Sequence, residues 1–436
     1  MSKKEVKTNA MRMLDRMKIP YEYEEYECDE FSDGIETADK LGYDHKYVYK
    51  TLVTTGKSGG HYVFVIPIEE EIDFKKAAKV VGEKSLEMLH LKELTKVTGY
   101  VRGGCTSIGM KKQFPTVIQE DAKELDLDGH VVLPGFIDMH CNICEPGFEN
   151  IEDISTVSRS AARGGFTSIT CEPNTKPVID NKTVVEYIIS KSKAQASVNI
   201  YPYGSMSMGC EGTAIAEIGE MYEAGVVAIS DGDEFIDSAA LMRNVMRYSR
   251  MFDLPIMTHC EDRSLSGKGV MNEGYTASCL GLSGMPREAE ELQVARNILL
   301  AEITGARLHI AHVSTGGSVR MVRDAKKRGL QVTCETCPHY FALTEEAVED
   351  YNTFAKVNPP LRTQEDVEAI LEGIADGTID AIASGHSPTS RTDKDKEFGN
   401  AAYGISALET AFSISFTKLV ETGIISLARL VLSLIH

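Results

Sequence analysis

No stretch of this 436-residue chain is apolar for long enough to cross a bilayer. The first residues, MSKKEVKTNAMRMLDRMKIPY, lack the uninterrupted apolar core of a signal peptide and predict an amphipathic helix instead. The ten cysteines are scattered, and Cys171, Cys260 and Cys334 lie inside apolar segments, unlike the framework of a disulfide-rich secreted domain. These absences favour a cytoplasmic protein with reduced thiols and no membrane partner.

Low-complexity tracts are also missing, and 42% of the residues are hydrophobic, as in a chain that is globular throughout. A length of 436 residues predicts two or three domains. The net charge of −19 is unevenly distributed, because basic and acidic residues are equal in number over residues 1–117. The acidic remainder argues against nucleic-acid binding there, whereas the balanced N-terminal part leaves room for a basic groove.

The first 120 residues predict a small domain of mixed helices and strands. Apolar residues at helical spacing indicate a helix that ends before Pro20. Further strands are expected at residues 21–26, 48–55 and 62–66, and further helices at residues 74–81 and 85–89. Lys50 falls inside an apolar strand, where a lysine either holds an anion or lies on an edge strand without a function.

Three segments of this domain, KTNAMRMLDRMKIPYEYEEYE, KYVYKTLV and TGYVRGGCTSIGMKK, resemble the YbaK family of aminoacyl-tRNA deacylases. The resemblance implies an editing domain over residues 1–120 that acts on a charged tRNA such as Cys-tRNA(Pro). It implies that Lys50 is the catalytic anchor for the terminal adenosine and phosphate, and that the pocket is lined by Tyr26, Thr51 and Gly104. The family's domain continues further, whereas this chain passes into the acidic segment QEDAKELDLDG, so we expect a truncated domain.

After a linker at residues 121–130, strands alternate with helices to the end of the chain. The expected strands are residues 131–140, 167–173, 197–203, 226–231, 255–262, 307–314, 330–337 and 381–386. The expected helices include residues 184–194, 239–251, 287–304 and 317–328. Parallel neighbouring strands need helical crossovers, so these units predict an α/β fold in which a (β/α)8 barrel, residues 131–436, follows the smaller α+β domain.

Polar residues occur where several of these strands end, and they are His140, Asp231, His259, His312 and His386. Active sites of such barrels lie at the carboxyl ends of the strands, and imidazole together with carboxylate suits zinc. A single histidine in such a place is more often a satisfied core residue. Five residues that converge from separate strands predict a metal site.

The surrounding motifs resemble the class I dihydroorotases of bacteria, and they include GGFTSITCEPNT, ISDGDEF, THCED, LHIAHVST, ETCPHYFALTEEAV and NPPLR. The resemblance implies zinc-dependent interconversion of a small cyclic amide and a carbamoyl amino acid. The metal ligands that it implies are His140, Asp231, His259 and His312, of which Asp231 is also assigned as catalytic. The substrate-binding residues that it implies are Asn174, Asn358, Tyr403 and Gly404.

Four positions depart from that family's pattern. They are Asn142 for a zinc-binding histidine, Cys144 for the arginine that pairs with the substrate carboxylate, Gly385 for the catalytic aspartate and Thr389 for a substrate-contacting histidine. The family's site is binuclear, but here we expect one zinc ion at most and a barrel that is weakly active or inactive. The alternative is a non-catalytic scaffold or oligomerisation partner, and the chain is a candidate homo-oligomer.

Overall fold

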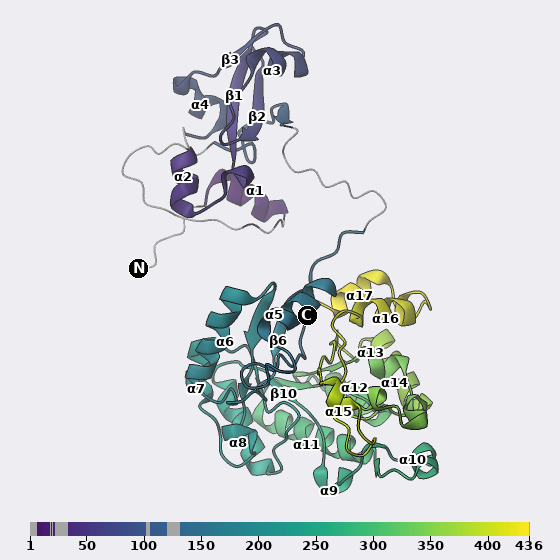
Figure 1. Ribbon diagram of the computed structural model, residues 1–436. Helices are drawn as coiled ribbons and strands as arrows, with labels where there is room; N and C mark the ends of the chain where they lie inside the picture. The colour runs from purple at the N-terminus through teal and green to yellow at the C-terminus, as the bar shows by residue number, and fades with distance from the viewer. Residues whose placement is uncertain are drawn as a thin grey trace. The chain divides into compact units, whose positions relative to one another are not determined.

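The computed structural model describes residues 7–17, 19, 21, 34–101, 105–119 and 131–435. The chain divides into two compact units, residues 1–131 and 132–436 (Figure 1). Each unit has its own sheet and its own apolar core. Within the described ranges, no helix combines the length and the apolar character needed to span a membrane.

The first unit is built on a four-stranded sheet in the order β3-β1-β2-β4. β1 (Tyr49–Gly56) and β2 (His61–Pro67) form an antiparallel pair that sets Lys50 opposite Ile66. β3 (Leu86–Met88) lies on the other side of β1, and β4 (Thr116–Ile118) pairs in parallel with β2. The strands expected at residues 48–55 and 62–66 are therefore confirmed.

The helices in the described part of this unit are α1 (Asn9–Met17), α2 (Gly34–Leu41), α3 (Phe74–Val80) and α4 (Leu91–Thr98). The helix expected at residues 85–89 is wrong. Leu86 packs into the core beside Phe64 and Ile66, and its segment pairs with β1 as an edge strand. Of the strand expected at residues 21–26, only Tyr21 lies within the described residues.

The second unit is a barrel of parallel strands. The strands β5 (Phe136–Asp138), β6 (Phe166–Cys171) and β7 (Asn199–Pro202) form one sheet. The other sheet runs through β8 (Gly204–Ser205), β9 (Ile229–Ser230), β10 (Ile256–Thr258), β13 (Leu308–Ile310), β14 (Val332–Thr336) and β15 (Ala381–Ile382).

Two connections close these sheets into a ring. β7 pairs with β6 and β8 pairs with β9, so the two stretches share one position of the ring on either side of Tyr203. On the opposite side, a parallel bridge between Cys141 and His386 joins the ends of β5 and β15. The expected α/β barrel is confirmed.

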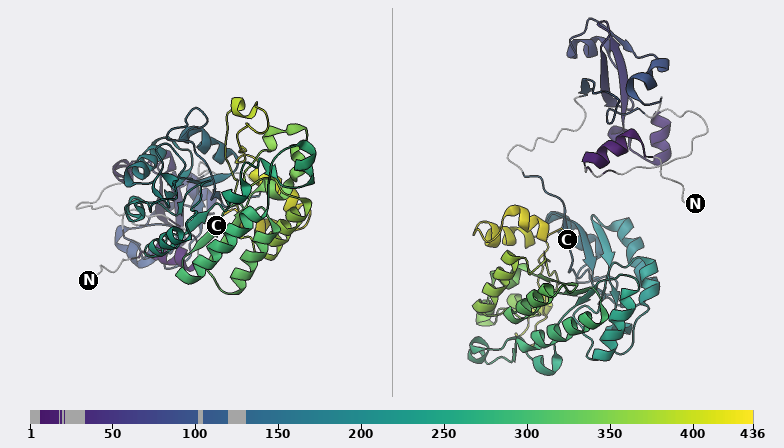
Figure 2. Two further views of the ribbon diagram at one scale, coloured as in Figure 1. Left: turned by 90° about the horizontal axis from the view of Figure 1, so that it is seen from below. Right: turned by 180° about the vertical axis from the view of Figure 1, so that it is seen from behind.

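Helices surround the strands (Figure 1, Figure 2). The longer ones are α5 (Ile154–Arg163), α6 (Lys182–Gln195), α7 (Ile218–Ala224), α8 (Ala239–Arg250), α11 (Glu288–Thr304), α12 (Gly316–Lys327), α14 (Gln364–Asp376) and α17 (Leu427–Ser433). Shorter elements in the loops and after β15 are α9 (Arg263–Ser266), α10 (Tyr275–Leu280), the paired β11 (Met271–Asn272) and β12 (Gly284–Met285), α13 (Pro338–Ala342), α15 (Arg391–Lys394) and α16 (Ala411–Ser415). The helices expected at residues 184–194, 239–251, 287–304 and 317–328 are confirmed.

The first barrel strand is shorter than expected. Val131 and Val132 are exposed, and the dipeptide Pro134-Gly135 precedes the start of β5 at Phe136. Proline cannot donate to a strand ladder, so pairing begins only after it. Farther along β5, Ile137 donates its backbone N–H to the carbonyl of Leu434 at 2.7 Å, and the segment after α17 thereby binds the first strand.

A substitution at Phe166 tests the packing of the barrel core. Its side chain on β6 is buried, with its ring packed edge-on against Phe136. We expect Phe166→Ala to lower the free energy of unfolding by about 3 to 5 kcal/mol, because truncation leaves a cavity in a packed core. Val227→Ala, at an exposed position, should change it by about 0.5 kcal/mol or less. Equal urea midpoints for the two variants would contradict the packing.

Candidate metal centre

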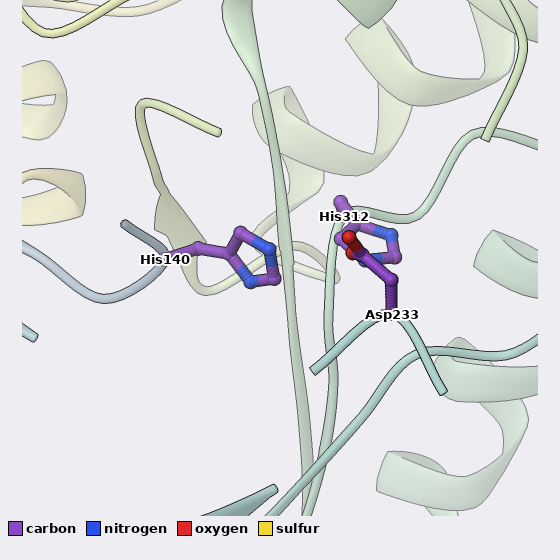
Figure 3. A group of neighbouring side chains, drawn as sticks. All are labelled: His140, Asp233 and His312. Carbon is purple, nitrogen blue, oxygen red and sulfur yellow. The ribbon is translucent and has the colours of Figure 1, made fainter. Parts of the chain in front are cut away.

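Three side chains converge at the carboxyl end of the barrel strands (Figure 3). His140 follows β5, Asp233 follows β9 and His312 follows β13, and parallel strands deliver all three to the same end. One potential ligand atom from each residue lies within 4.8 Å of the other two. Two imidazoles and one carboxylate are a donor set that zinc accepts, and three protein ligands leave a position for water or substrate.

The two histidines of this group are buried, whereas Asp233 is exposed. His312 has a backbone φ of 36°, a conformation that non-glycine residues rarely adopt. Burial, followed by the charges of His140 and His259, holds the pKa of His312 well below its usual value. A neutral imidazole is the form that coordinates a metal, so this environment suits a ligand.

His259 extends the group in another direction. Its Nδ1 lies 3.1 Å from Nε2 of His312, and its Nε2 lies 3.1 Å from the carboxylate of Glu261. Glu261 also accepts a hydrogen bond from the side chain of Asn358 at 3.0 Å. The expected ligand His259 is therefore hydrogen-bonded to His312 instead of meeting Asp233 and His140 directly.

Two buried carboxylates lie behind His140. Its Nδ1 is 3.4 Å from Glu335 and 3.6 Å from Glu172, and the oxygens of both carboxylates lack a hydrogen-bond partner. Burial opposes the charged form of His140, but the negative charges of Glu172 and Glu335 raise its pKa to about 10. Burial raises the pKa of Glu172 to about 7. These carboxylates lie on the Nδ1 side of the ring and interact with it through charge, because no hydrogen bond joins them to it.

Asp231, an expected ligand, makes hydrogen bonds of its own beside this group. Its Oδ1 accepts hydrogen bonds from the backbone N–H groups of Met206 and Ser207, and its Oδ2 accepts one from the Ser207 hydroxyl at 2.6 Å. Both oxygens are engaged in joining the segments that follow β8 and β9. Asp233, two residues later in the same motif, is the carboxylate that lies near His140 and His312.

His386 does not join the group either. Its Nε2 contacts Glu152 at 2.7 Å, and its Nδ1 accepts a hydrogen bond from the backbone of Ala407. Of the five residues expected at the strand ends, His140 and His312 are grouped with Asp233, and the metal-binding roles of the others stay predictions.

A small cavity opens beside the group, with a volume of about 40 Å3, or about 410 Å3 when its open mouth is included. Three of the expected substrate-binding residues line it, namely Asn358, Tyr403 and Gly404. Asn174 is not among the lining residues and lies against Gly232. Sequence reasoning missed His339, which lines the cavity from the start of α13 and whose pKa burial lowers to about 3.

Gly385 occupies a restrictive position in this cavity. Its φ is 64°, and a Cβ atom there would lie 2.7 Å from Sγ of Cys337 and 3.0 Å from the ring of His339. The space beside its backbone is therefore already filled. Cys144 and Thr389 are absent from the lining, whereas Asn142 is present. Burial raises the pKa of Cys144 to about 12, which favours the thiol form in the metal-free chain.

In the first unit, Lys50 is half-buried on β1 and donates a hydrogen bond from Nζ to the backbone carbonyl of Ile68 at 2.9 Å. Thr51 is also half-buried. Tyr26 and Gly104, which the resemblance placed in the same pocket, lie outside the described residues.

Two family models match the chain. Residues 31–132 match the aminoacyl-tRNA editing domain, and residues 129–318 match the dihydroorotase-like family. The dihydroorotase of Acetivibrio thermocellus is 52% identical over 323 residues, which are 72% of this chain and 76% of that protein. The dihydroorotase of Caldanaerobacter subterraneus subsp. tengcongensis is 53% identical over 311 residues, 71% and 72% of the two chains.

The chain belongs to the dihydroorotase family. It is thus a member of a hydrolase family. In this chain a tRNA-editing domain of the YbaK type precedes the hydrolase domain. Solved structures share the fold at lower identity. L-hydantoinase from Arthrobacter aurescens has a TM-score of 0.63 at 24% identity, covering 77% of this chain and 76% of that one. Dihydroorotase from Saccharomyces cerevisiae has a TM-score of 0.56 at 15% identity, covering 70% and 82%.

Two variants test whether Asp233 or Asp231 binds the metal. We expect Asp233→Asn to lower the zinc content of the dialysed chain several-fold with little loss of stability, because its side chain is exposed. Asp231→Asn should keep the zinc and lower the free energy of unfolding by about 1 to 3 kcal/mol, because it disrupts buried hydrogen bonds. The measurements are elemental analysis and urea unfolding. Zinc loss in Asp231→Asn alone would restore Asp231 as the ligand.

Proposed function

We propose that the chain joins a cytoplasmic tRNA-editing module, residues 1–120, through a linker at residues 121–130 to a dihydroorotase-family barrel, residues 131–436. The barrel holds one zinc ion at most, on His140, Asp233 and His312, and its dihydroorotase activity is weak or absent. The observation that carries this proposal is Gly385. No carboxylate stands there, and Cys337 and His339 fill the adjoining space.

The chemistry explains why this position matters. A divalent ion held by His140, Asp233 and His312 supplies a Lewis acid when bound. Hydrolysis of a cyclic amide also needs a group that takes a proton from the attacking water and returns it to the leaving nitrogen. In the family that group is the aspartate replaced by Gly385, and losing a general base costs about 10² to 10⁴ in rate. Asn358, Tyr403 and Gly404 keep a cavity wall that can contact a ligand.

Turnover of dihydroorotate tests the barrel. We expect the zinc-loaded full chain to show no rate above a control without enzyme. Gly385→Asp alone should restore nothing and should lower thermal stability, because its Cβ meets Cys337 and His339. Gly385→Ala is the matched control, since it introduces the same contact without a carboxylate. Measurable turnover by the unmodified chain would contradict the proposal.

Rescue should require the substitutions together. Asn142→His, Cys144→Arg, Gly385→Asp and Thr389→His restore the family's residues, and groups that act as a unit are not additive. We expect any recovered activity only in the combined variant, measured by the same assay. Recovery by one single reversion would show that the other three positions are not limiting.

For the first unit, we propose that Lys50 anchors the terminal phosphate of Cys-tRNA(Pro), and that the substrate's own side chain attacks the ester. Support comes from the editing-domain match and from the bond that holds the Lys50 amine at the Ile68 carbonyl. Lys50→Ala should reduce deacylation at least about tenfold with the fold retained, because lysine binds phosphate as a point charge. Lys57→Ala, at an exposed turn, is the control. Equal deacylation rates for Lys50→Ala and the unmodified chain would end this assignment.

A second function for the barrel is a non-catalytic scaffold or oligomerisation partner. The observation that favours it is the cavity, whose 40 Å3 is about the space of a single bound water or slightly more. Light scattering and ligand titration, each with and without zinc, distinguish the two functions. A scaffold keeps its oligomeric state when zinc is removed. A metal-dependent site changes its ligand binding when zinc is added.

A further inference from the structure

The outer face of α11 carries an apolar row of side chains. Its members, Leu292, Leu299 and Ile303, are 53%, 59% and 65% exposed. Residues that are seven and four positions apart lie on one side of a helix, so these three form a single row about 16 Å long. Val294 and Ala301, on the other side of α11, are buried in the barrel core. The helix is therefore apolar on two sides, and only one of them faces the core.

The outer faces of nearby helices are charged. α11 lies on the outside of the barrel and contacts α8 and α12 (Figure 1). The exposed residues of α12 include Arg320, Asp324 and Lys327, and those of α14 include Glu368 and Glu372. An exposed apolar row inside a charged rim is the pattern of a protein–protein interface.

The middle of the row leaves room for another helix. Ala295, a small and half-buried residue, lies between Leu292 and Leu299 along α11. Arg296, which follows it, is also half-buried, and its guanidinium donates to the carbonyl of Ile236 at 2.7 Å in the loop before α8. Alternation of large and small side chains lets two helices interdigitate. The row is therefore suited to a helix as its partner.

The two ends of the row carry opposite charges. Glu288 is exposed in the first turn of α11 and forms no ion pair with another described residue. At the other end, the exposed Arg250 donates to the carbonyl of Thr304 at 2.9 Å, and its guanidinium lies against Gly305, which ends α11. A guanidinium has five N–H groups, so this bond leaves donors for a carboxylate.

Other charged side chains near the two ends are paired within the chain. These pairs lie 2.7, 3.4 and 3.5 Å apart, and they are Arg328 with Glu302, Arg307 with Asp253 and Arg287 with Asp366. Glu288 and Arg250 are then the charges that a partner of the row can use.

Met251 extends the apolar surface beyond α11. It directly follows Arg250 at the end of α8 and is 74% exposed. A standard interface buries about 800 Å2 on each partner, more than the row alone provides, so residues of α8 and α12 must contribute. A folded barrel presents those flanking helices together with α11, which a single short peptide does not.

We infer that α11 is the centre of a two-fold contact, in which it packs antiparallel against α11 of a second copy of this chain. In that orientation Leu292 faces Ile303 of the other copy, and Glu288 faces Arg250. A parallel orientation would set Glu288 against Glu288 and Arg250 against Arg250. A two-fold contact uses the same surface on both copies, and the antiparallel orientation matches this surface to itself in both apolar character and charge.

The contact gives a surface to the oligomerisation proposed for the barrel, but it depends neither on a bound metal nor on turnover. Sedimentation velocity of the full chain tests it. We expect a dimer with a dissociation constant of about 1 µM or lower. A chain that stays monomeric at about 50 µM would overturn the inference.

Leu299→Glu tests the apolar row. It should weaken the dimer at least about tenfold, because it places a charge in an apolar contact. Leu432→Glu, at an exposed leucine of α17, is the matched control and should leave the dimer unchanged. Equal dissociation constants for the two variants would show that the copies meet elsewhere. Zinc content should be the same in both variants, so failure of the proposed metal site is distinguishable from failure of this inference.

Charge reversal tests the antiparallel orientation. Glu288→Arg and Arg250→Glu should each weaken the dimer several-fold, because each places like charges opposite one another. The two positions lie at opposite ends of α11 within one chain, too far apart to interact directly. Their combination in one chain should therefore recover the dimer only if they meet between copies. Additive weakening in the double variant would contradict the antiparallel contact.

Discussion

The position of His140 between two buried carboxylates and the cavity is the constraint on which the barrel site depends. Glu172 and Glu335 lie on the Nδ1 side of the ring, and Asp233 and His312 lie on the cavity side. The strands that supply these groups are parallel, so their polar ends share one face of the barrel. Removing the two carboxylates would leave the buried ring of His140 without its negative partners, which is costly in a low-dielectric interior.

Gly385 is the position on which the proposed loss of activity depends. It adopts a left-handed backbone with Cys337 and His339 against it, so little space remains there for a larger side chain. Asn142 remains in the cavity with an unpartnered oxygen. The structure thus offers a possible metal site of two histidines and one carboxylate, beside a cavity lined by Asn142 and Gly385.

The sequence predicted the barrel well, because alternating apolar strands and helices leave few alternatives for a parallel sheet. It placed His140 and His312 at strand ends, where the structure groups them with Asp233. Asp233 was not expected there, because spacing alone cannot show that the oxygens of Asp231 are engaged by Met206 and Ser207. Residues 85–89 were taken as a helix because the pairing of their segment with β1 depends on tertiary contacts that local periodicity does not contain.

X-ray absorption at the zinc edge of the loaded full chain tests the central claim most directly, namely that the barrel retains a single metal centre of histidine and carboxylate ligands. The account predicts nitrogen and oxygen neighbours at about 2.0 to 2.2 Å and no sulfur. It also predicts no metal–metal vector. A zinc–zinc distance of about 3.5 to 4 Å would show that the binuclear site survives and would contradict the account.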